Sequence, residues 1–256
     1  MIQVRVQPAN PGQFFACCGL LELADRLWAG AEGWFEESSF HARPLTGSSG
    51  QTLEGTLAAI GTASLHQVDP DDDYSSPIQI AAPFGLDLDW WKDTRAGGDR
   101  LKVWAGSMRS VRIARAMQSA LRNPDFQTEA LFDAGTVVYD PAEPDKKVEP
   151  FYFDSRRGCS AQSVDVGFSA DALQMTSQAF PAVEFLCLVG LQRFRPRPTG
   201  QPRVFEYFCW SVPYPPAIAA AAACGAMGLP AHGFRFENGF RTDQRKHKAF
   251  LSATPI

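Results

Sequence analysis

The chain has 256 residues, 45% of them hydrophobic and 12% aromatic, which is enough to bury a substantial core and excludes a globally disordered chain. Its first residues alternate between apolar and polar types, and its longest apolar stretch, residues 217–223, is far too short to span a bilayer. We therefore expect neither a signal peptide nor a membrane protein. The net charge of −4 is unevenly distributed: residues 1–99 contain 5 basic and 14 acidic side chains, whereas residues 100–256 contain 19 and 14. This asymmetry predicts one basic binding face and a separate acidic face.

Hydrophobic periodicity predicts helices and short strands in both halves of the chain. In the first half we expect, in order, a strand (1–7), a helix (14–27), a strand (34–42), a helix (52–63), an acidic loop (69–76), a strand-like segment (78–88) and a helix (107–122). In the second half we expect short strands (136–140, 151–154), a strongly apolar helix (181–194), a strand (203–212), an alanine-rich helix opened by Pro215 and Pro216, and a terminal strand pair (234–242, 248–253). This order predicts an α+β fold of mixed helices and short, mainly antiparallel strands.

The clearest local signals lie at the first helix. Asn10 followed by proline is typical of an N-cap and the first helical position, and Glu22 and Arg26 have the spacing of an i,i+4 ion pair. Gly30 and Gly33 are expected to end this helix. At the start of the later helix, Ser107 is the expected cap.

The domain organisation allows two descriptions. The Pro-, Lys- and Glu-rich segment 141–150 is the best linker candidate, and it would separate an acidic half (1–145), which includes the basic helix 107–122, from a basic half (146–256). The alternative is one compact unit. Residues 15–17 (Phe-Ala-Cys) resemble residues 185–187 (Phe-Leu-Cys), so the two halves could be related by duplication or alike by chance.

A search for catalytic motifs finds none. The chain has no nucleophile elbow, phosphate-binding loop, dinucleotide fingerprint or zinc-protease motif, and its four histidines and six cysteines show no metal-ligand spacing. The cysteines are expected to be reduced apolar fillers. The acidic run 71–73 lacks the glycine and closing glutamate of a calcium loop. We therefore expect no cofactor, no metal and no enzymatic activity, although a composite active site built from distant residues remains an alternative.

Basic segments carry the stronger signal. From Arg100 to Asn123 there are six positive charges and no acid, and on a helical wheel the arginines lie opposite the apolar residues. Arginines without an acid at i±4 repel one another unless an anion lies alongside, so we expect a phosphate-binding face. Residues 193–198 (Arg-Phe-Arg-Pro-Arg-Pro) predict an extended run whose alternate arginines project together. Residues 156–157 and 245–248 extend the pattern, the latter more simply as a solvated turn.

The nucleic-acid contacts predicted from these segments are Arg100, Lys102, Arg109, Arg112, Arg115, Arg156, Arg157, Arg193, Arg195 and Arg197.

A family resemblance rests on residues 10–25, which read NPGQFFACCGLLELAD. This segment resembles the N-terminal signature of a CRISPR-associated family from subtype I-U (I-G) loci, in which an Asn-Pro-Gly-Gln turn enters a helix carrying Ala-Cys-x-Gly-(Leu/Phe)-Leu-Glu. Residues 153–157 (Phe-Asp-Ser-Arg-Arg) and 166–168 (Val-Gly-Phe) are similar to that family as well.

The resemblance implies a role without chemistry. The family is regarded as a reduced large subunit of Cascade, the cytoplasmic RNA-guided surveillance complex used in antiviral defence. Guide RNA supplies sequence specificity there, while the large subunit recognises the short flanking motif (the PAM) in target DNA and stabilises the opened strands of the R-loop. The implied partners are other Cascade subunits, which the acidic half would face, together with guide RNA, target DNA and a recruited helicase-nuclease.

Two alternatives from other classes stay open. The chain could be a ribonuclease that processes guide RNA, with His41 or His232 as general base. It could instead be a structural adaptor whose arginines bind acidic protein surfaces rather than nucleic acid.

Overall fold

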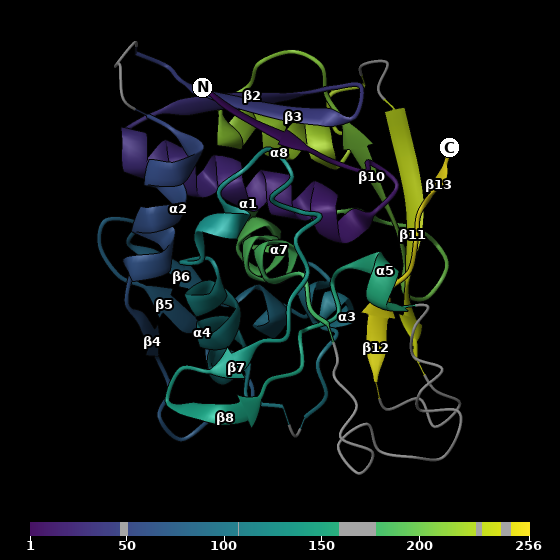
Figure 1. Ribbon diagram of the computed structural model, residues 1–256. Coiled ribbons are helices and arrows are strands. Elements are labelled where there is room, and N and C mark those ends of the chain that lie inside the picture. Colours follow the sequence, from purple (N-terminus) through teal and green to yellow (C-terminus); the bar gives the residue numbers. More distant parts are fainter. Residues whose placement is uncertain (47–50, 107, 159–177, 229–231, 242–246) are drawn as a thin grey trace.

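The computed structural model describes residues 1–46, 51–106, 108–158, 178–228, 232–241 and 247–256. Two buried helices, α1 (Pro11–Trp28) and α7 (Pro181–Arg193), lie at the centre and cross steeply: α1 runs across Figure 1, whereas α7 is seen end-on. The remaining helices are α2 (Leu53–Thr62), α3 (Gly98–Leu101), α4 (Ser110–Ala120), α5 (Ser155–Gly158) and α8 (Pro216–Ala223), with 3-10 turns η1 (Trp90–Lys92) and η2 (Pro124–Phe126).

Several small antiparallel sheets surround these helices. One contains β1 (Ile2–Arg5), β3 (Ser39–Pro44) and β2 (Ala31–Glu36) in that order. The largest has the order β12 (Lys248–Phe250), β11 (His232–Phe240), β10 (Val204–Cys209) and β9 (Arg197–Pro198), and β13 (Thr254–Pro255) also pairs with β11. A third sheet has the order β4 (Leu65–Gln67), β5 (Ile78–Ile80) and β6 (Leu86–Leu88). A two-stranded sheet is formed by β7 (Tyr139–Asp140) and β8 (Glu143–Lys147). The predicted α+β class is confirmed.

The sequence signals at α1 are confirmed in detail. The Asn10 side-chain oxygen accepts hydrogen bonds from the backbone N–H groups of Gly12 (3.1 Å) and Gln13 (3.4 Å), which satisfies free donors at the helix start. Arg26 pairs with Glu22 at 2.8 Å. The helix ends at Ala29, which is left-handed, whereas the expected terminator Gly33 lies within β2.

The apolar helix α7 is buried along its length from Pro181 to Leu191. A helix without a polar face is covered on all sides, either by its own core or by a partner. Here the chain itself covers α7, because α1 packs on one side and α4 on another.

The α1–α7 crossing brings two backbones into direct contact. A Cβ atom added to Gly19 would lie 1.9 Å from the carbonyl oxygen of Leu186, and one added to Gly190 would lie 2.0 Å from the carbonyl oxygen of Phe15. Neither position can therefore hold a side chain at this separation. Beside the crossing, Glu22 of α1 accepts hydrogen bonds from the Arg193 guanidinium at 2.5 and 3.2 Å.

Four expected elements are corrected by the structure. The single strands expected at 34–42 and 78–88 are each part of a hairpin, because the chain turns at Glu37 (φ 51°) and again between Ala81 and Gly85. The expected linker 141–150 contains β8, since the Asp140 carboxylate accepts from the N–H of Ala142 and closes a turn. Residues 151–154, expected as a strand, have no regular structure. The N-cap position of α4 is occupied by Arg109 and not by the expected Ser107, which lies outside the described residues.

One hydrophobic core includes residues on both sides of the boundary expected near residue 145, such as Phe15, Trp90, Phe185 and Phe250. Cys17, Cys18, Cys187 and Cys209 are free and buried within it, and Cys159 lies outside the described residues. Every helix in the described part of the chain is too short or too polar to span a bilayer.

Replacing either crossing glycine should destabilise the protein strongly. We expect Gly19→Ala and Gly190→Ala each to lower the free energy of unfolding by at least about 1–3 kcal/mol, because the added methyl group forces the two backbones apart. Gly55→Ala in α2 is the matched control, since its Cβ would meet only the Thr52 hydroxyl at 3.4 Å. The control should be neutral or stabilising by up to about 1 kcal/mol. Urea unfolding of the three variants measures this, and equal effects at all three positions would contradict the close crossing.

Candidate nucleic-acid interface

Two of the arginines at α4 are paired with acids from distant parts of the same chain, and a third is held by a backbone carbonyl. Arg109, which caps the helix, lies 3.1 Å from the carboxylate of Asp73, and Arg112 pairs with Asp140. Arg115 donates to the carbonyl oxygen of Leu65 at 2.9 Å. The anion expected beside this helix is therefore, at least in part, the protein's own carboxylates. Arg112 and Arg115 also attach α4 to its neighbours, so these side chains are not free of the fold as the helical wheel implies.

The expected comb of arginines at 193–197 does not form. Helix α7 continues through Arg193, whose guanidinium binds Glu22, and hydrogen bonding from Arg193 and Arg26 holds the pKa of that carboxylate below its usual range in spite of burial. Arg195 is half-buried and lies over the ring of Trp90, 5.9 Å from its centroid. Arg197 is in β9, where it pairs with Glu206 at 2.6 Å.

Arg156 belongs to a buried cluster of polar side chains and not to an open basic face. We call this cluster the polar node; it consists of Asn10, Asp154, Arg156 and Glu184. Its guanidinium bonds to the buried carboxylate of Asp154 at 2.6 Å and to the carbonyl oxygen of Phe132 at 2.5 Å, and it stacks over Phe180. These contacts fix Arg156 in place and compensate its charge.

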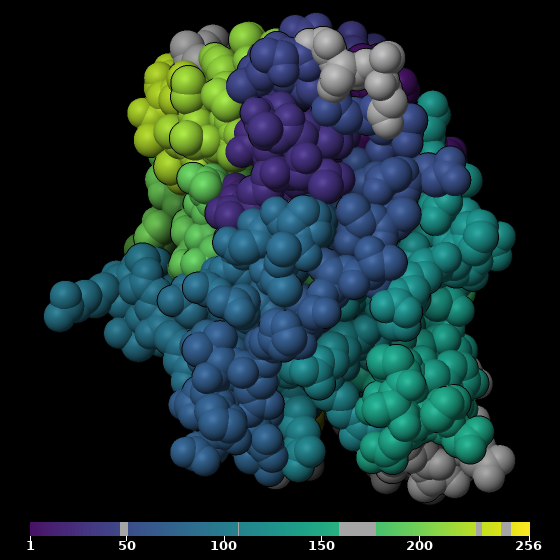
Figure 2. Space-filling model, turned by 90° about the vertical axis from the view of Figure 1, so that its left-hand side faces the viewer, coloured from purple at the N-terminus to yellow at the C-terminus, as the bar shows by residue number. Residues whose placement is uncertain are grey.

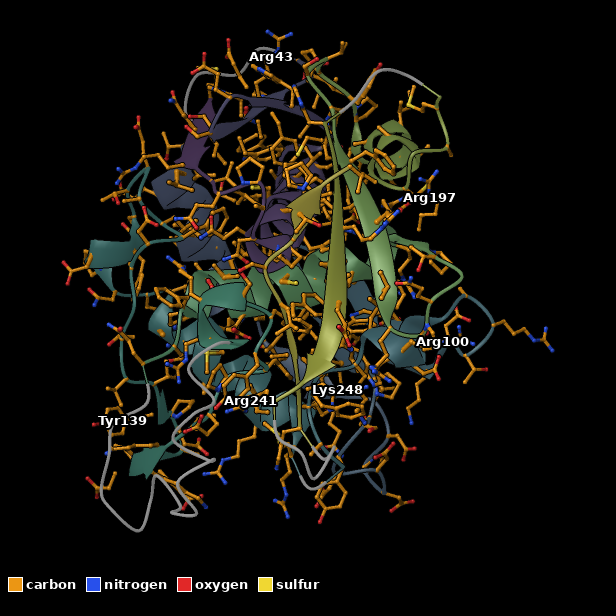
Figure 3. The ribbon with its side chains drawn as sticks, turned by 90° about the vertical axis from the view of Figure 1, so that its right-hand side faces the viewer. Arg43, Arg100, Tyr139, Arg197, Arg241 and Lys248 are labelled. Atoms are coloured by element: carbon orange, nitrogen blue, oxygen red, sulfur yellow. The ribbon has the colours of Figure 1, made fainter. Side chains whose placement is uncertain are left out.

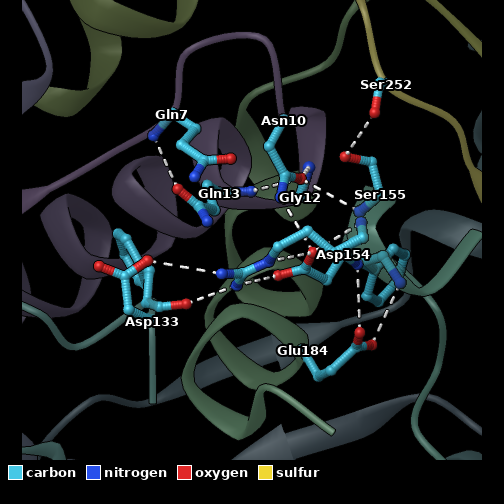
Figure 4. Close-up of polar contacts among 12 residues, drawn as sticks. Gln7, Asn10, Gly12, Gln13, Asp133, Asp154, Ser155, Glu184 and Ser252 are labelled. Atoms are coloured by element: carbon cyan, nitrogen blue, oxygen red, sulfur yellow. Dashed lines mark hydrogen bonds and ion pairs between the residues drawn. The ribbon is translucent and has the colours of Figure 1, made fainter. Parts of the chain in front are cut away.

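The same node joins the two segments that carry the family resemblance (Figure 4). Asn10 donates to Asp154 at 2.9 Å and accepts from the N–H of Ser155 at 3.2 Å, so the residue that caps α1 also holds the segment 153–157. Gly12 is required here, because a Cβ atom would lie 2.3 Å from the carbonyl oxygen of Phe153. Both motifs thus have a structural role. The third similar segment, 166–168, lies outside the described residues.

Glu184 of α7 also belongs to this polar node (Figure 4). Its carboxyl group is fully buried and accepts hydrogen bonds from the backbone N–H groups of Phe153 (3.2 Å) and Asp154 (3.1 Å). Burial raises the pKa of Glu184 to about 8, the Asp154 carboxylate adds to the rise, and the backbone donors oppose it.

Glu184 should make stability pH-dependent. Between pH about 4.5 and 8 the folded protein holds a proton that the unfolded chain has released, so the contribution of Glu184 to stability falls as the pH rises through this range. Glu184→Gln should remove that part of the slope and lower the free energy of unfolding at pH 5 by about 1–3 kcal/mol, because glutamine offers one acceptor to two N–H groups. Urea unfolding at pH 5, 6, 7 and 8 tests this. Parallel curves for wild type and variant would count against a neutral Glu184.

A separate cluster of cations lies around the β11–β12 hairpin and the end of α3. We call it the basic surface; it consists of Arg100, Lys102, Arg203, Arg241 and Lys248. Asn238 of β11 donates to the carbonyl oxygens of Arg100 (2.7 Å) and Lys102 (3.4 Å), and this fixes the α3 end against the sheet. Figure 3 shows Arg100, Lys248 and Arg241 on one face of the molecule, with Arg197 further along the same face. The N-terminal half, with its acidic excess, covers most of the opposite face (Figure 2).

Aromatic rings, more than carboxylates, contact these cations. Lys102 lies over Trp104 (5.1 Å to the centroid), Arg203 over Phe240 (4.7 Å) and Arg241 over Tyr152 (3.4 Å). A cation–π contact orders the side chain without neutralising its charge. Arg203 also makes a long ion pair of 3.4 Å with Glu237, and both side chains are partly exposed.

Burial and nearby positive charges disfavour the charged form of the lysines in the basic surface. Burial lowers the pKa of Lys248, and the nearby charges of Arg203 and Lys102 lower it further, against a smaller opposing effect of Asp99. The pKa of Lys102 is lowered chiefly by burial, with the Asp72 carboxylate opposing this and the Lys92 charge adding to it, and its ammonium donates to the Ser75 hydroxyl. No carboxylate in the described part of the chain lies within ion-pair distance of Lys248. An anion bound here would relieve both the repulsion and the desolvation.

Only part of this surface was found from the sequence. Arg100 and Lys102 belong to it, and Arg157 borders it, 6.0 Å from the Tyr152 ring that Arg241 covers. Arg203 and Arg241 were missed, and Lys248 was assigned to a solvated turn. These three residues share one feature that the sequence shows, which is that each lies at the end of a strand. Arg203 directly precedes β10, Arg241 directly follows β11, and Lys248 begins β12. Residues 245–246 lie outside the described residues.

The two histidines considered for catalysis, His41 and His232, lie on strands of different sheets, β3 and β11. His41 is buried, stacks on Trp34 with ring centroids 5.1 Å apart, and its Nε2 is 3.5 Å from Glu36. His232 is exposed at the start of β11. Among the residues that the structure describes, no three His, Cys, Asp or Glu side chains form a metal-binding group, and the acid Asp72 of the acidic run pairs with Lys92 instead.

Comparisons with protein-family models, with curated proteins and with solved structures each found no match to this chain.

Removing cations from the basic surface should not harm the fold. Because the charges of Arg203 and Lys102 repel Lys248, we expect Lys248→Ala to leave the free energy of unfolding unchanged within about 1 kcal/mol or to raise it. Arg112→Ala is the contrasting variant: it leaves the Asp140 carboxylate, which is largely buried, without its cation and should destabilise the protein. Thermal or urea unfolding distinguishes the two, and a larger loss at Lys248 than at Arg112 would contradict the described electrostatics.

Proposed function

We propose that this chain is a non-catalytic, nucleic-acid-binding subunit of an RNA-guided type I CRISPR effector in the cytoplasm, and that the basic surface holds the sugar-phosphate backbone. The observation that carries the proposal is the convergence of Lys102, Arg203 and Lys248 on one face, with Lys248 lacking an ion-pair partner among the described residues. The resemblance of residues 10–25 and 153–157 to the Cascade-associated family supports the same role.

The chemistry of the basic surface suits phosphate. Arginine and lysine neutralise phosphates and release condensed counterions, which gives affinity without sequence preference. Guanidinium groups stacked on Phe240 and Tyr152 are pre-ordered, so less side-chain entropy is lost on binding. In this proposal base pairing with the guide RNA supplies sequence specificity, while this subunit contacts target DNA, including the flanking motif, and helps to keep the strands apart. The opposite, acidic side faces other subunits.

The test is the salt dependence of DNA binding by the full chain. In the variant Lys102→Ala/Arg203→Ala/Lys248→Ala, three lost phosphate contacts should reduce the slope of log affinity against log salt by about 2–3. The matched control is Arg5→Ala/Arg43→Ala/Arg95→Ala, which removes the same charge from exposed positions outside the basic surface.

The control should keep the wild-type slope. A slope that falls equally in both triple variants would show that only net charge matters, and an unchanged slope in the first would remove the basic surface from the interface. A third variant, Arg109→Ala, tests the α4 arginines separately: because Arg109 is paired with Asp73, we expect a smaller effect than that of any single basic-surface change.

A further inference from the structure

A concave feature lies on the same face, beside the end of α8. It is a groove of 410 Å³ with aromatic walls formed by Phe208, Trp210 and Tyr214, and with Arg197 at its rim. The Arg197 guanidinium lies over the Phe208 ring at 4.8 Å from the centroid. The volume is within the range of small-molecule sites, and the lining is mostly apolar with few polar groups, as such sites are.

The walls of the groove are held in place from behind. The indole N–H of Trp210 donates to the carbonyl oxygen of Gly33 at 2.7 Å, and the backbone of Tyr214 pairs with that of Gly33 in both directions. Gly225 allows the Phe208 ring to sit against the end of α8, since a Cβ atom there would be 2.6 Å from the ring. The groove is thus pre-formed and does not require rearrangement before a ligand enters.

The groove and Arg203, one cation of the basic surface, are connected along the outer face of the large sheet. Lys248 is paired with Phe240 across β12 and β11 and points to the other side of the sheet. Arg197, Glu206 and Arg235 are cross-strand neighbours on β9, β10 and β11, and Glu206 pairs with both arginines at 2.6 Å, so this row keeps one net positive charge. Glu237, the partner of Arg203, follows Arg235 by two residues and therefore points to the same side of β11. A polyanion held at Arg203 would pass this row on its way to the groove.

We propose that the groove receives an unpaired nucleobase, so that the nucleic acid bound on this face is a single strand. This inference rests on the proposed function and adds the form of the ligand. Stacking on aromatic rings and on arginine planes is how proteins bind exposed bases without sequence preference. The bases of an intact duplex are stacked inside the helix and cannot enter such a groove. Among the described residues that line the groove, Arg197 is the one charged side chain, so a base stacked there meets a guanidinium plane and apolar walls.

The test compares two oligonucleotides on the full-length protein. One is a single-stranded oligothymidylate of about 12 nucleotides, within the length range of such sites, and the other has the same backbone with abasic positions throughout. We expect the wild-type protein to bind the first about fivefold to 150-fold more tightly, the value of one stacked base. In Ser211→Trp, an indole placed at the groove wall should lower the affinity for oligothymidylate to the abasic level and leave abasic binding unchanged.

Gln201→Trp, an exposed position in the turn before β10, is the control for adding an indole to this face and should behave as wild type. Equal wild-type affinity for the two oligonucleotides would overturn the groove assignment while leaving backbone binding by the basic surface intact. Wild-type affinity of Ser211→Trp for oligothymidylate would overturn the groove assignment as well. If neither oligonucleotide binds even at low salt, the proposed function itself fails.

Discussion

The contact of two helix backbones at Gly19 and Gly190 is the constraint on which the rest of the structure depends. Because α1 and α7 cross there without intervening side chains, both helices can be buried in a chain of this size. The crossing places the capped start of α1 at the polar node with Asp154 and Glu184, and it places Glu22 beside the last residue of α7. From that end the chain continues through Phe194 into β9, so the crossing also determines where Arg197 and the large sheet lie.

The chain's cations divide into two groups by the partners they meet. Arg112, Arg156 and Arg193 are paired with the carboxylates of Asp140, Asp154 and Glu22, and they serve mainly to join elements. Lys102, Arg203 and Arg241 of the basic surface lie over aromatic rings, which leave their charge in place, and the charges of Arg203 and Lys102 act on Lys248. In the proposed function, stability and binding therefore depend on different arginines and lysines. A surface that retains mutual repulsion in the folded state is a reasonable candidate for function.

Features that depend on neighbouring residues in the chain could be predicted from the sequence, whereas contacts between distant segments could not. The helices, the Asn10 cap and the Glu22–Arg26 pair follow from spacing along the chain, and the α+β class follows from their order. The turn at Glu37 was missed because it falls within a segment that reads as one strand, and the turn after Asp140 was missed because residues 141–150 have the composition of a linker. The partners of the α4 arginines were missed because Asp73 lies in another loop and Asp140 in a hairpin that reads as a linker. The basic surface joins residues from three separate segments, and no pattern in one sequence reveals such a convergence.

The most direct test of the central claim is chemical modification of lysines in the full-length protein with and without single-stranded DNA. Lys102 and Lys248 belong to the basic surface, whereas Lys146 and Lys147 lie on β8 in another sheet. Reductive methylation followed by mass spectrometry measures the accessibility of each ammonium group. Bound DNA should protect Lys102 and Lys248 several-fold and leave Lys146 and Lys147 as reactive as before. Protection of Lys146 and Lys147 with no change at Lys102 and Lys248 would contradict the account.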